Sequence, residues 1–295
     1  MALAASVGRN LSVTPPVMVG EEKAQETLSS QGVAALCHIV YQDAGIVLDE
    51  SKRYLLETRL KPLADARGLA NLDQLCQLIR LDQSLRKKAV EAMTTNETLF
   101  FRDVAPYDAL RQTVIPELAE RRRRERRLSI WSAASSSGQE PYSLALMFRE
   151  SFPQLRDWAI RILGTDICES MLERARKGRY RQLEVNRGLP VQYLVKYFQR
   201  DHLEWELKPE IRQMVEFRQF NLMDPMRLLG AFDVVLCRNV LIYFDTELKK
   251  KILAGIRSVL LPDGYLILGG AETVYHLDDH YERKPMGQVC FYQPK

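Results

Sequence analysis

Apolar residues recur at helical spacing over residues 31–93 and then give way to short apolar runs separated by polar turns. In the first region, residues such as Val33, Leu36, Cys37 and Val40 stand three or four positions apart, which places them on one face of a helix. The pattern predicts a small all-α domain over residues 31–93.

Two apolar runs in the second region are separated by about the length of one βαβ unit. Leu128–Trp131 and Ala159–Thr165 each have the pattern of a buried strand. Between them lie small residues, Ser132–Gly138, and a helical pattern that begins near Pro141, a residue favoured at a helix start. Strand, small-residue turn, helix and strand together predict a Rossmann-like α/β arrangement.

The second run ends in an acidic residue, Asp166. A carboxylate at the end of that strand can accept hydrogen bonds from both hydroxyls of a ribose, while the small-residue turn leaves room for the ligand. The turn contains one glycine, Gly138, where the dinucleotide fingerprint has three. NAD is therefore disfavoured and an adenosyl ligand without phosphates is favoured, although this stretch alone leaves open a βαβ unit that binds nothing.

Later runs extend this sheet. The apolar strand Phe232–Cys237 changes to polar residues at its carboxyl end, where ligands bind in open α/β sheets, so Arg238, Asn239 and Tyr243 are site candidates. Residues from about 190 to 216 break the βαβ rhythm and alternate between polar and apolar, which predicts a small inserted antiparallel β-subdomain. A closing turn, strand and hairpin is the ending expected of an S-adenosylmethionine-dependent methyltransferase sheet.

Composition narrows the class of protein. Hydrophobic residues at 46% and charged ones at 27% are typical of a soluble globular protein, and no apolar run approaches the roughly 20 residues that span a bilayer. The five cysteines are odd in number and scattered, and no secretory signal is apparent. We therefore expect a reducing, cytoplasmic compartment and no metal site. Residues 1–30, rich in small and polar types, are predicted to form a mobile tail.

Basic residues gather in two places although the net charge is only +4. Lys52, Arg53, Arg59 and Lys61 give the second predicted helix a basic face, which is either a solvated surface or a docking site for an acidic protein helix or nucleic acid. The run Arg121–Arg127 resembles a nucleic-acid arm but closes a helix, where cations are favourable. No nucleic-acid motif accompanies either group, so we expect no nucleic-acid partner.

The linker of residues 94–105 carries polar groups, Asn96, Thr98 and Arg102, that could reach the cofactor cleft. Together with three later motifs it resembles the bacterial chemotaxis receptor glutamate methyltransferases, over about residues 31–292. The four motifs are Thr94–Arg102, Trp131–Ser143, Gly164–Ile167 and Cys237–Phe244. The resemblance implies an all-α domain (31–93), the linker (94–105) and a Rossmann-like methyltransferase domain (106–295) with its inserted β-subdomain.

The resemblance also implies site residues and a function. By motif, the S-adenosylmethionine contacts are Asn96, Thr98, Arg102, Glu140, Asp166, Asn221, Leu222, Arg238 and Asn239, with Arg102 and Tyr243 closest to the transferred methyl. The implied reaction forms methyl esters on glutamates in the acidic helical region of methyl-accepting chemoreceptors, for sensory adaptation, and yields S-adenosylhomocysteine. The implied protein is a monomer that meets the membrane only through the receptor, and its basic face would dock that receptor.

Some members of the family capture a pentapeptide at the receptor's C-terminus with a glycine-rich loop. The corresponding turn, Gln199–Glu204, has no glycine, so we expect no pentapeptide tethering. A nucleic-acid methyltransferase and a non-catalytic cofactor-binding signalling adaptor remain as alternatives. The first lacks the Asn-Pro-Pro-Tyr type of motif, and the second leaves the presence of both Arg102 and Tyr243 unexplained.

Overall fold

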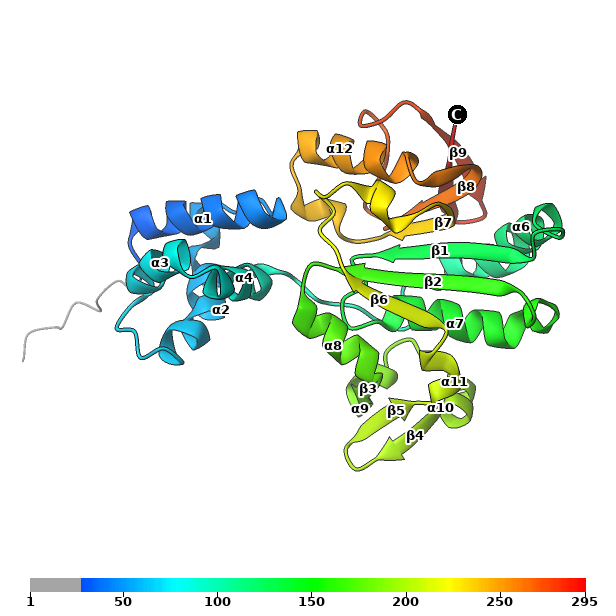
Figure 1. Cartoon of the computed structure of the whole chain (residues 1–295), viewed down its shortest axis with the longest axis horizontal. Coiled ribbons are helices and arrows are strands. Elements are labelled where there is room, and N and C mark those ends of the chain that lie inside the picture. Colours follow the sequence, from blue (N-terminus) through cyan, green and yellow to red (C-terminus); the bar gives the residue numbers. More distant parts are fainter. Residues whose placement is uncertain (1–27) are drawn as a thin grey trace, which may run out of the picture.

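A computed structural model describes residues 28–295 and places a helical domain against one end of a twisted sheet (Figure 1). Most of the predicted tail, residues 1–27, lies outside the described residues. The last residues assigned to that tail belong instead to the helical domain. Leu28 is fully buried, and the Ser29 hydroxyl accepts the N–H of Gly32 at the start of the first helix.

The helical domain is built from four helices and one 3-10 turn around a single apolar core. Polar residues mark where three of the helices begin: the side chains of Ser29, Asn71 and Asp82 each accept a backbone N–H of the first turn. The elements are α1 (Ser30–Ala44), η1 (Glu50–Lys52), α2 (Arg53–Asp65), α3 (Leu72–Leu81) and α4 (Gln83–Met93).

The second domain contains a seven-stranded sheet in the order β6-β2-β1-β7-β8-β10-β9. The first five strands in this order are parallel, and β10 pairs antiparallel with both of its neighbours. The strands are β1 (Arg127–Ala133), β2 (Ala159–Asp166), β6 (Val215–Gln219), β7 (Phe232–Cys237), β8 (Leu260–Leu268), β9 (Tyr281–Met286) and β10 (Val289–Pro294).

Helices cover both faces of this sheet. Successive strand residues point to opposite faces, so apolar side chains of one strand contribute to a core on each side. In β1, Leu128 and Ile130 pack into a core with α7, whereas Trp131 and Ala133 pack into a second core with α12. Figure 1 shows α12 above the sheet and α7 below it. The helices and short turns of this domain are α5 (Ala105–Ala109), the π-helical η2 (Leu110–Val114), α6 (Ile115–Arg121), α7 (Gln139–Ser151), η3 (Pro153–Leu155), α8 (Glu169–Lys177), η4 (Met226–Leu229), η5 (Leu241–Tyr243) and α12 (Thr246–Arg257).

A separate three-stranded antiparallel sheet, in the order β3-β5-β4, forms the insertion. The predicted bounds of about 190–216 need correction. The first strand lies earlier, where Arg179–Arg181 pairs with β5, and Val215 already belongs to β6 of the main sheet. Three residues are too few to show a strand alternation in the sequence. The elements are β3 (Arg179–Arg181), α9 (Gln182–Val185), α10 (Val191–Tyr197), β4 (Phe198–Asp201), β5 (Glu204–Leu207) and α11 (Pro209–Arg212).

The predicted fold class is confirmed: an all-α domain precedes a Rossmann-like α/β domain that carries a small antiparallel sheet. Among residues 28–295, no helix is both long and apolar enough to cross a membrane. The helical domain lies off the carboxyl ends of the parallel strands (Figure 1), which is the edge where α/β sheets bind ligands.

Candidate active site

A cavity opens at the carboxyl ends of β1, β2 and β7, between the sheet and the helical domain. In the sheet order, β1 lies between β2 and β7, so the cavity is at the point where the strand order reverses, which is where α/β sheets bind ligands. Every residue predicted by motif lines it: Asn96, Thr98, Arg102, Glu140, Asp166, Asn221, Leu222, Arg238, Asn239 and Tyr243.

Asp166 closes the end of β2 with both carboxylate oxygens engaged by backbone. One oxygen accepts the N–H of Ser136 at 2.8 Å and the other accepts the N–H of Cys168 at 2.9 Å. Burial raises the pKa of this carboxyl group above its usual value, while these hydrogen bonds favour the ionised form. Each oxygen keeps acceptor capacity toward the cavity, so the group can receive two ribose hydroxyls.

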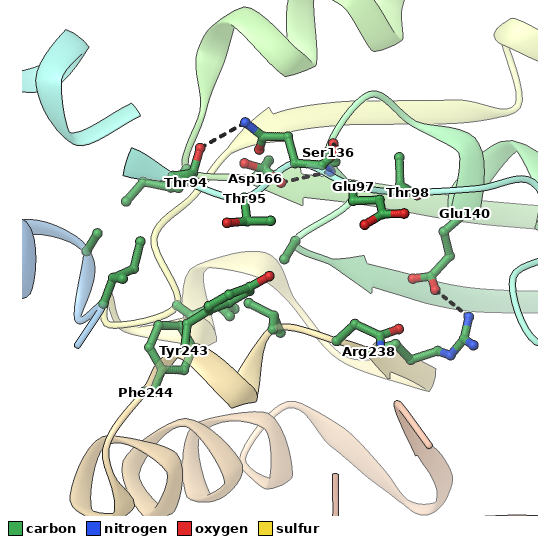
Figure 2. Close-up of a pocket in the computed structure, with 18 of the residues that line it drawn as sticks. Thr94, Thr95, Glu97, Thr98, Ser136, Glu140, Asp166, Arg238, Tyr243 and Phe244 are labelled. Atoms are coloured by element: carbon green, nitrogen blue, oxygen red, sulfur yellow. Dashed lines mark hydrogen bonds and ion pairs between the residues drawn. The ribbon is translucent and has the colours of Figure 1, made fainter. Parts of the chain in front are cut away.

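The small-residue turn after β1 is packed closely against α8 and the linker. Gly138 has a φ of +91°, and a Cβ there would lie 2.9 Å from the Cβ of Ala175. The Ser136 hydroxyl donates to the carbonyl oxygen of Asn96 at 2.8 Å. The turn therefore also holds the linker against the cavity. Figure 2 shows the bond between Ser136 and Asp166.

Arg238 occupies the opposite end of the cavity, with its side chain only 2% exposed. Its guanidinium donates to the carboxylates of Glu140 at 3.0 Å and Asp103 at 2.7 Å, and to the carbonyl oxygen of Arg102 at 2.9 Å. Glu140 in turn accepts from the hydroxyl of Ser132 at 2.8 Å. The guanidinium thus joins the end of β7 to α7 and the linker, while its Nε has no hydrogen-bond partner among the described residues.

Backbone strain is concentrated around the same cavity. Phe101, Asp103, Ser136 and Asn239 all have left-handed φ values, of 49°, 64°, 49° and 58°, although none of them is glycine. Such conformations persist only where surrounding contacts determine them, and they are frequent at binding and catalytic sites. The segment from Phe101 to Asp103 is held by Arg238 and by the bond from the Phe101 N–H to the Ser143 hydroxyl, at 2.9 Å.

Two polar groups face the cavity and suit a ligand that carries both a cation and a sugar. The buried amide oxygen of Asn239 has no hydrogen-bond partner among the described residues, so it can accept from a ligand ammonium group. Tyr243 points its hydroxyl toward the middle of the cavity in Figure 2. With Asp166 and the apolar side chains of Ile167 and Leu222, these groups match the parts of S-adenosylmethionine.

The helical domain forms one wall of the cavity, through Ala44 and Ile46. The side chain of Asn221 is used in this contact: its amide nitrogen donates to the carbonyl oxygen of Asp43 at 2.7 Å, and its oxygen accepts the N–H of Met223. Sequence reasoning missed the domain wall, because no local pattern marks which helix end will face a sheet. It also missed Thr94, Thr95, Glu97 and Ser136, which belong to the polar linker and the small-residue turn.

The predicted docking residues divide into two kinds. Arg59 donates to the carbonyl oxygens of Met93 and Thr94, both at 2.9 Å, and so holds the start of the linker against α2. Arg53 contacts Glu50 and the backbone of Leu28. Lys52 is exposed, and Lys61 is 68% exposed beside Asp65, so these two lysines are presented to solvent.

No group of three or more His, Cys, Asp or Glu side chains suited to a metal ion occurs in the part of the chain that the structure describes. The five cysteines are all unbridged thiols. The polar groups that line the cavity are carboxylates, amides, hydroxyls and the guanidinium groups of Arg102 and Arg238.

Known proteins resemble the chain along most of its length. A family model described as "CheR methyltransferase, SAM binding domain" matches residues 96–290, and one described as "CheR methyltransferase, all-alpha domain" matches residues 31–94. The chain is 45% identical to chemotaxis protein methyltransferase Cher2 of Pseudomonas putida over 258 residues, covering 85% of this chain and 93% of the relative. It is also 45% identical to chemotaxis protein methyltransferase 1 of Pseudomonas aeruginosa, over 85% and 93% of the two chains, and 42% identical to chemotaxis protein methyltransferase of Vibrio parahaemolyticus, over 87% and 94%.

We predict that Arg238→Ala lowers the free energy of unfolding by about 3 to 5 kcal/mol, because it leaves Glu140 beside the cavity without its cation. Urea unfolding followed by tryptophan fluorescence measures this, since the three tryptophans lie outside the helical domain. Arg123→Ala is the control: this arginine is 66% exposed and pairs only with Glu120, so its loss should change stability by less than about 0.5 kcal/mol. Equal effects of the two substitutions would contradict the anchoring role of Arg238.

Proposed function

The chain belongs to the CheR methyltransferase family, and we propose that it methylates glutamate γ-carboxylates in the cytoplasmic helical region of chemoreceptors. One observation carries the proposal: a single cavity at the carboxyl edge of the sheet gathers every motif residue of the cofactor site together with Tyr243. When bound, S-adenosylmethionine supplies a methyl group that passes from its sulfonium sulfur to a carboxylate oxygen, leaving S-adenosylhomocysteine.

The composition of the cavity agrees with a reaction that needs no general base. A glutamate γ-carboxylate has a reference pKa of about 4.3 and is already ionised at neutral pH. The protein has to align this nucleophile and remove part of its water. The cavity offers side chains that can orient the carboxylate and exclude water. It does not pair a nucleophilic side chain with an activating base among the residues that line it.

For the cofactor, we assign Asp166 to the ribose hydroxyls and the free amide oxygen of Asn239 to the ammonium group. Asn96, Thr98, Glu140 and the apolar Leu222 complete the contacts, according to their places on the cavity wall. Asn221 contributes through its backbone, because its side-chain amide is committed to Asp43 and Met223.

For the reaction, we assign Arg102 to the incoming carboxylate and Tyr243 to the shape of its approach. Arg102 lines the cavity, and its guanidinium has only a long contact, 3.3 Å, to the carbonyl oxygen of Glu97. It is therefore available for a bidentate bond to a carboxylate. Arg238 keeps the Arg102 backbone in place but is committed to other partners.

For the receptor, we assign docking to the exposed part of the basic face on η1 and α2. Lys52 and Lys61 are presented to solvent, whereas Arg59 is committed to the linker. An acidic helix would be attracted to this face by an interaction that salt screens. Pentapeptide capture has less support, because β4 and β5 are joined by only His202 and Leu203, with no glycine-rich loop.

We predict that the purified protein transfers label from methyl-labelled S-adenosylmethionine to membranes that contain chemoreceptors, and that mild alkali releases the label as methanol. Such release is specific to a carboxyl methyl ester. Label retained after alkali, or label on added RNA or DNA, would contradict the proposal. Cofactor binding with no transfer to any receptor preparation would favour a signalling adaptor.

We predict that Tyr243→Phe lowers kcat about 10-fold and Arg102→Ala about 100-fold, since small misalignments of the reacting groups are costly. Asp166→Asn should instead weaken cofactor binding, by about 10- to 100-fold, because charged hydrogen bonds are lost. Calorimetric titration with S-adenosylhomocysteine and the label assay separate the two effects. Tyr275→Phe, which removes the hydroxyl of a tyrosine that is 65% exposed, should leave both unchanged.

We predict that the double substitution Lys52→Glu, Lys61→Glu raises the KM for receptor several-fold at low ionic strength and less at high ionic strength, with cofactor affinity unchanged. Lys250→Glu with Lys284→Glu changes the net charge equally on α12 and β9 and should have little effect. If both pairs raise KM alike, the receptor responds to net charge and the basic face has no docking role.

A further inference from the structure

Glu272 follows the end of β8, outside the wall of the cavity, and its carboxylate accepts four backbone N–H groups. One oxygen accepts from Val240 at 2.9 Å and from Leu241 at 2.8 Å, while the other accepts from Asn239 at 2.8 Å and from Gly269 at 2.7 Å. Three of these donors belong to the turn that follows β7 and leads into Tyr243. The carboxylate therefore fixes the backbone of that turn from behind.

The strand register explains how two distant segments meet here. Cys237 at the end of β7 pairs with Leu268 at the end of β8, so the residues after each strand lie side by side. Beyond this point the regular ladder stops, and the backbone donors of the turn need another acceptor. Glu272 supplies that acceptor. One of its donors is Asn239, so the carboxylate also holds a residue with a left-handed backbone.

We infer that Glu272 is a positioning residue for methyl transfer, acting through the turn that places Tyr243 in the cavity. This inference rests on the function proposed above and on the role assigned there to Tyr243. The carboxylate is held by Gly269 and by the turn, and the turn continues as η5, which contains Tyr243. A shift of the turn would move Tyr243, and with it Asn239, which is one of several assigned cofactor contacts, while leaving Asp166, on β2, in place.

Gly269 gives a second route to the same contacts. A Cβ at this position would lie 2.7 Å from the carboxylate oxygen of Glu272, 2.8 Å from the side-chain nitrogen of Asn239 and 2.9 Å from its backbone nitrogen. Gly269→Ala must therefore displace the carboxylate, the Asn239 side chain or the turn. The next residue is a matched control, because a Cβ on Gly270 would meet nothing within 4 Å.

The test measures kcat for receptor methylation and the dissociation constant of S-adenosylhomocysteine for Glu272→Gln, which keeps the size of the side chain but replaces one acceptor oxygen with a donor. We expect kcat to fall about 10- to 100-fold and the dissociation constant to change by less than about fivefold. Glu282→Gln, which alters a carboxylate on β9 that is 56% exposed, and Gly270→Ala should match the unsubstituted protein.

The decisive comparison repeats Glu272→Gln in a Tyr243→Phe background. If Glu272 acts through Tyr243, Glu272→Gln should lower kcat less than about threefold in the Tyr243→Phe protein, because the contribution of the Tyr243 hydroxyl is already lost. Gly269→Ala should behave in the same way, and it replaces Glu272→Gln if that variant does not fold. Equal losses in both backgrounds, equal losses of turnover and cofactor affinity, or full turnover in both variants would each overturn the inference.

The same assay separates this inference from the function on which it rests. Alkali-labile label with the unsubstituted protein, combined with equal losses in the two backgrounds, removes only the role of Glu272. A Tyr243→Phe variant with normal turnover removes the assignment of Tyr243 and the inference together. No transfer by the unsubstituted protein removes the proposed function itself.

Discussion

A guanidinium buried as deeply as that of Arg238 requires carboxylate and carbonyl partners, and the partners of its two terminal nitrogens organise the site. Its partners come from the linker and from α7, while the arginine itself follows β7. These segments are far apart in the sequence, so the ion-pair network holds together parts of the chain that the sheet alone would not align. The strained conformations of Phe101 and Asp103 are a consequence, since the linker has to bend sharply to place both Asp103 and a carbonyl oxygen on one cation.

The helical domain packs against the same edge of the sheet and is held there by hydrogen bonds of its own. Tyr41 bonds to Asp245 at 2.6 Å, the N–H of Val47 bonds to the carbonyl oxygen of Tyr243 at 2.9 Å, and Glu91 accepts the N–H of Glu169 at the start of α8. Each of these contacts lies next to a residue of the cavity wall. The position of the helical domain and the shape of the cavity are therefore linked, and a domain that separated from the sheet would open the wall formed by Ala44 and Ile46.

Much of this arrangement could be predicted from local patterns. The strands around the cavity, the carboxylate of Asp166 at the end of β2 and the polar edge after β7 follow from apolar runs that end in polar residues. The resemblance to the family is confirmed by the matching family models. What could not be predicted depends on contacts between distant segments. Arg59 was grouped with surface cations because its spacing on α2 is that of a solvated face, yet it is bonded to the linker. Glu272 lies in a loop where no sequence pattern marks it, and the register of β7 against β8 brings it to the turn after β7.

These contacts also show how binding and turnover can be separated in one small enzyme. The groups assigned to the ribose and to the receptor lie on β2 and on the helical domain. The groups assigned to the carboxylate, Arg102 and Tyr243, lie on two segments, 101–103 and 239–243, and the second segment also carries Asn239, assigned to the cofactor ammonium. Arg238 holds the first segment at one end of the cavity, and Glu272 holds the second from outside it. In the proposed reaction the nucleophile is already ionised, so we expect turnover to depend on where these two segments place Arg102 and Tyr243. Precise backbone placement then has the importance that a tuned acid or base has in other enzymes. This explains why carboxylates with several backbone or guanidinium partners surround the cavity, although neither Asp103 nor Glu272 needs to touch the substrate.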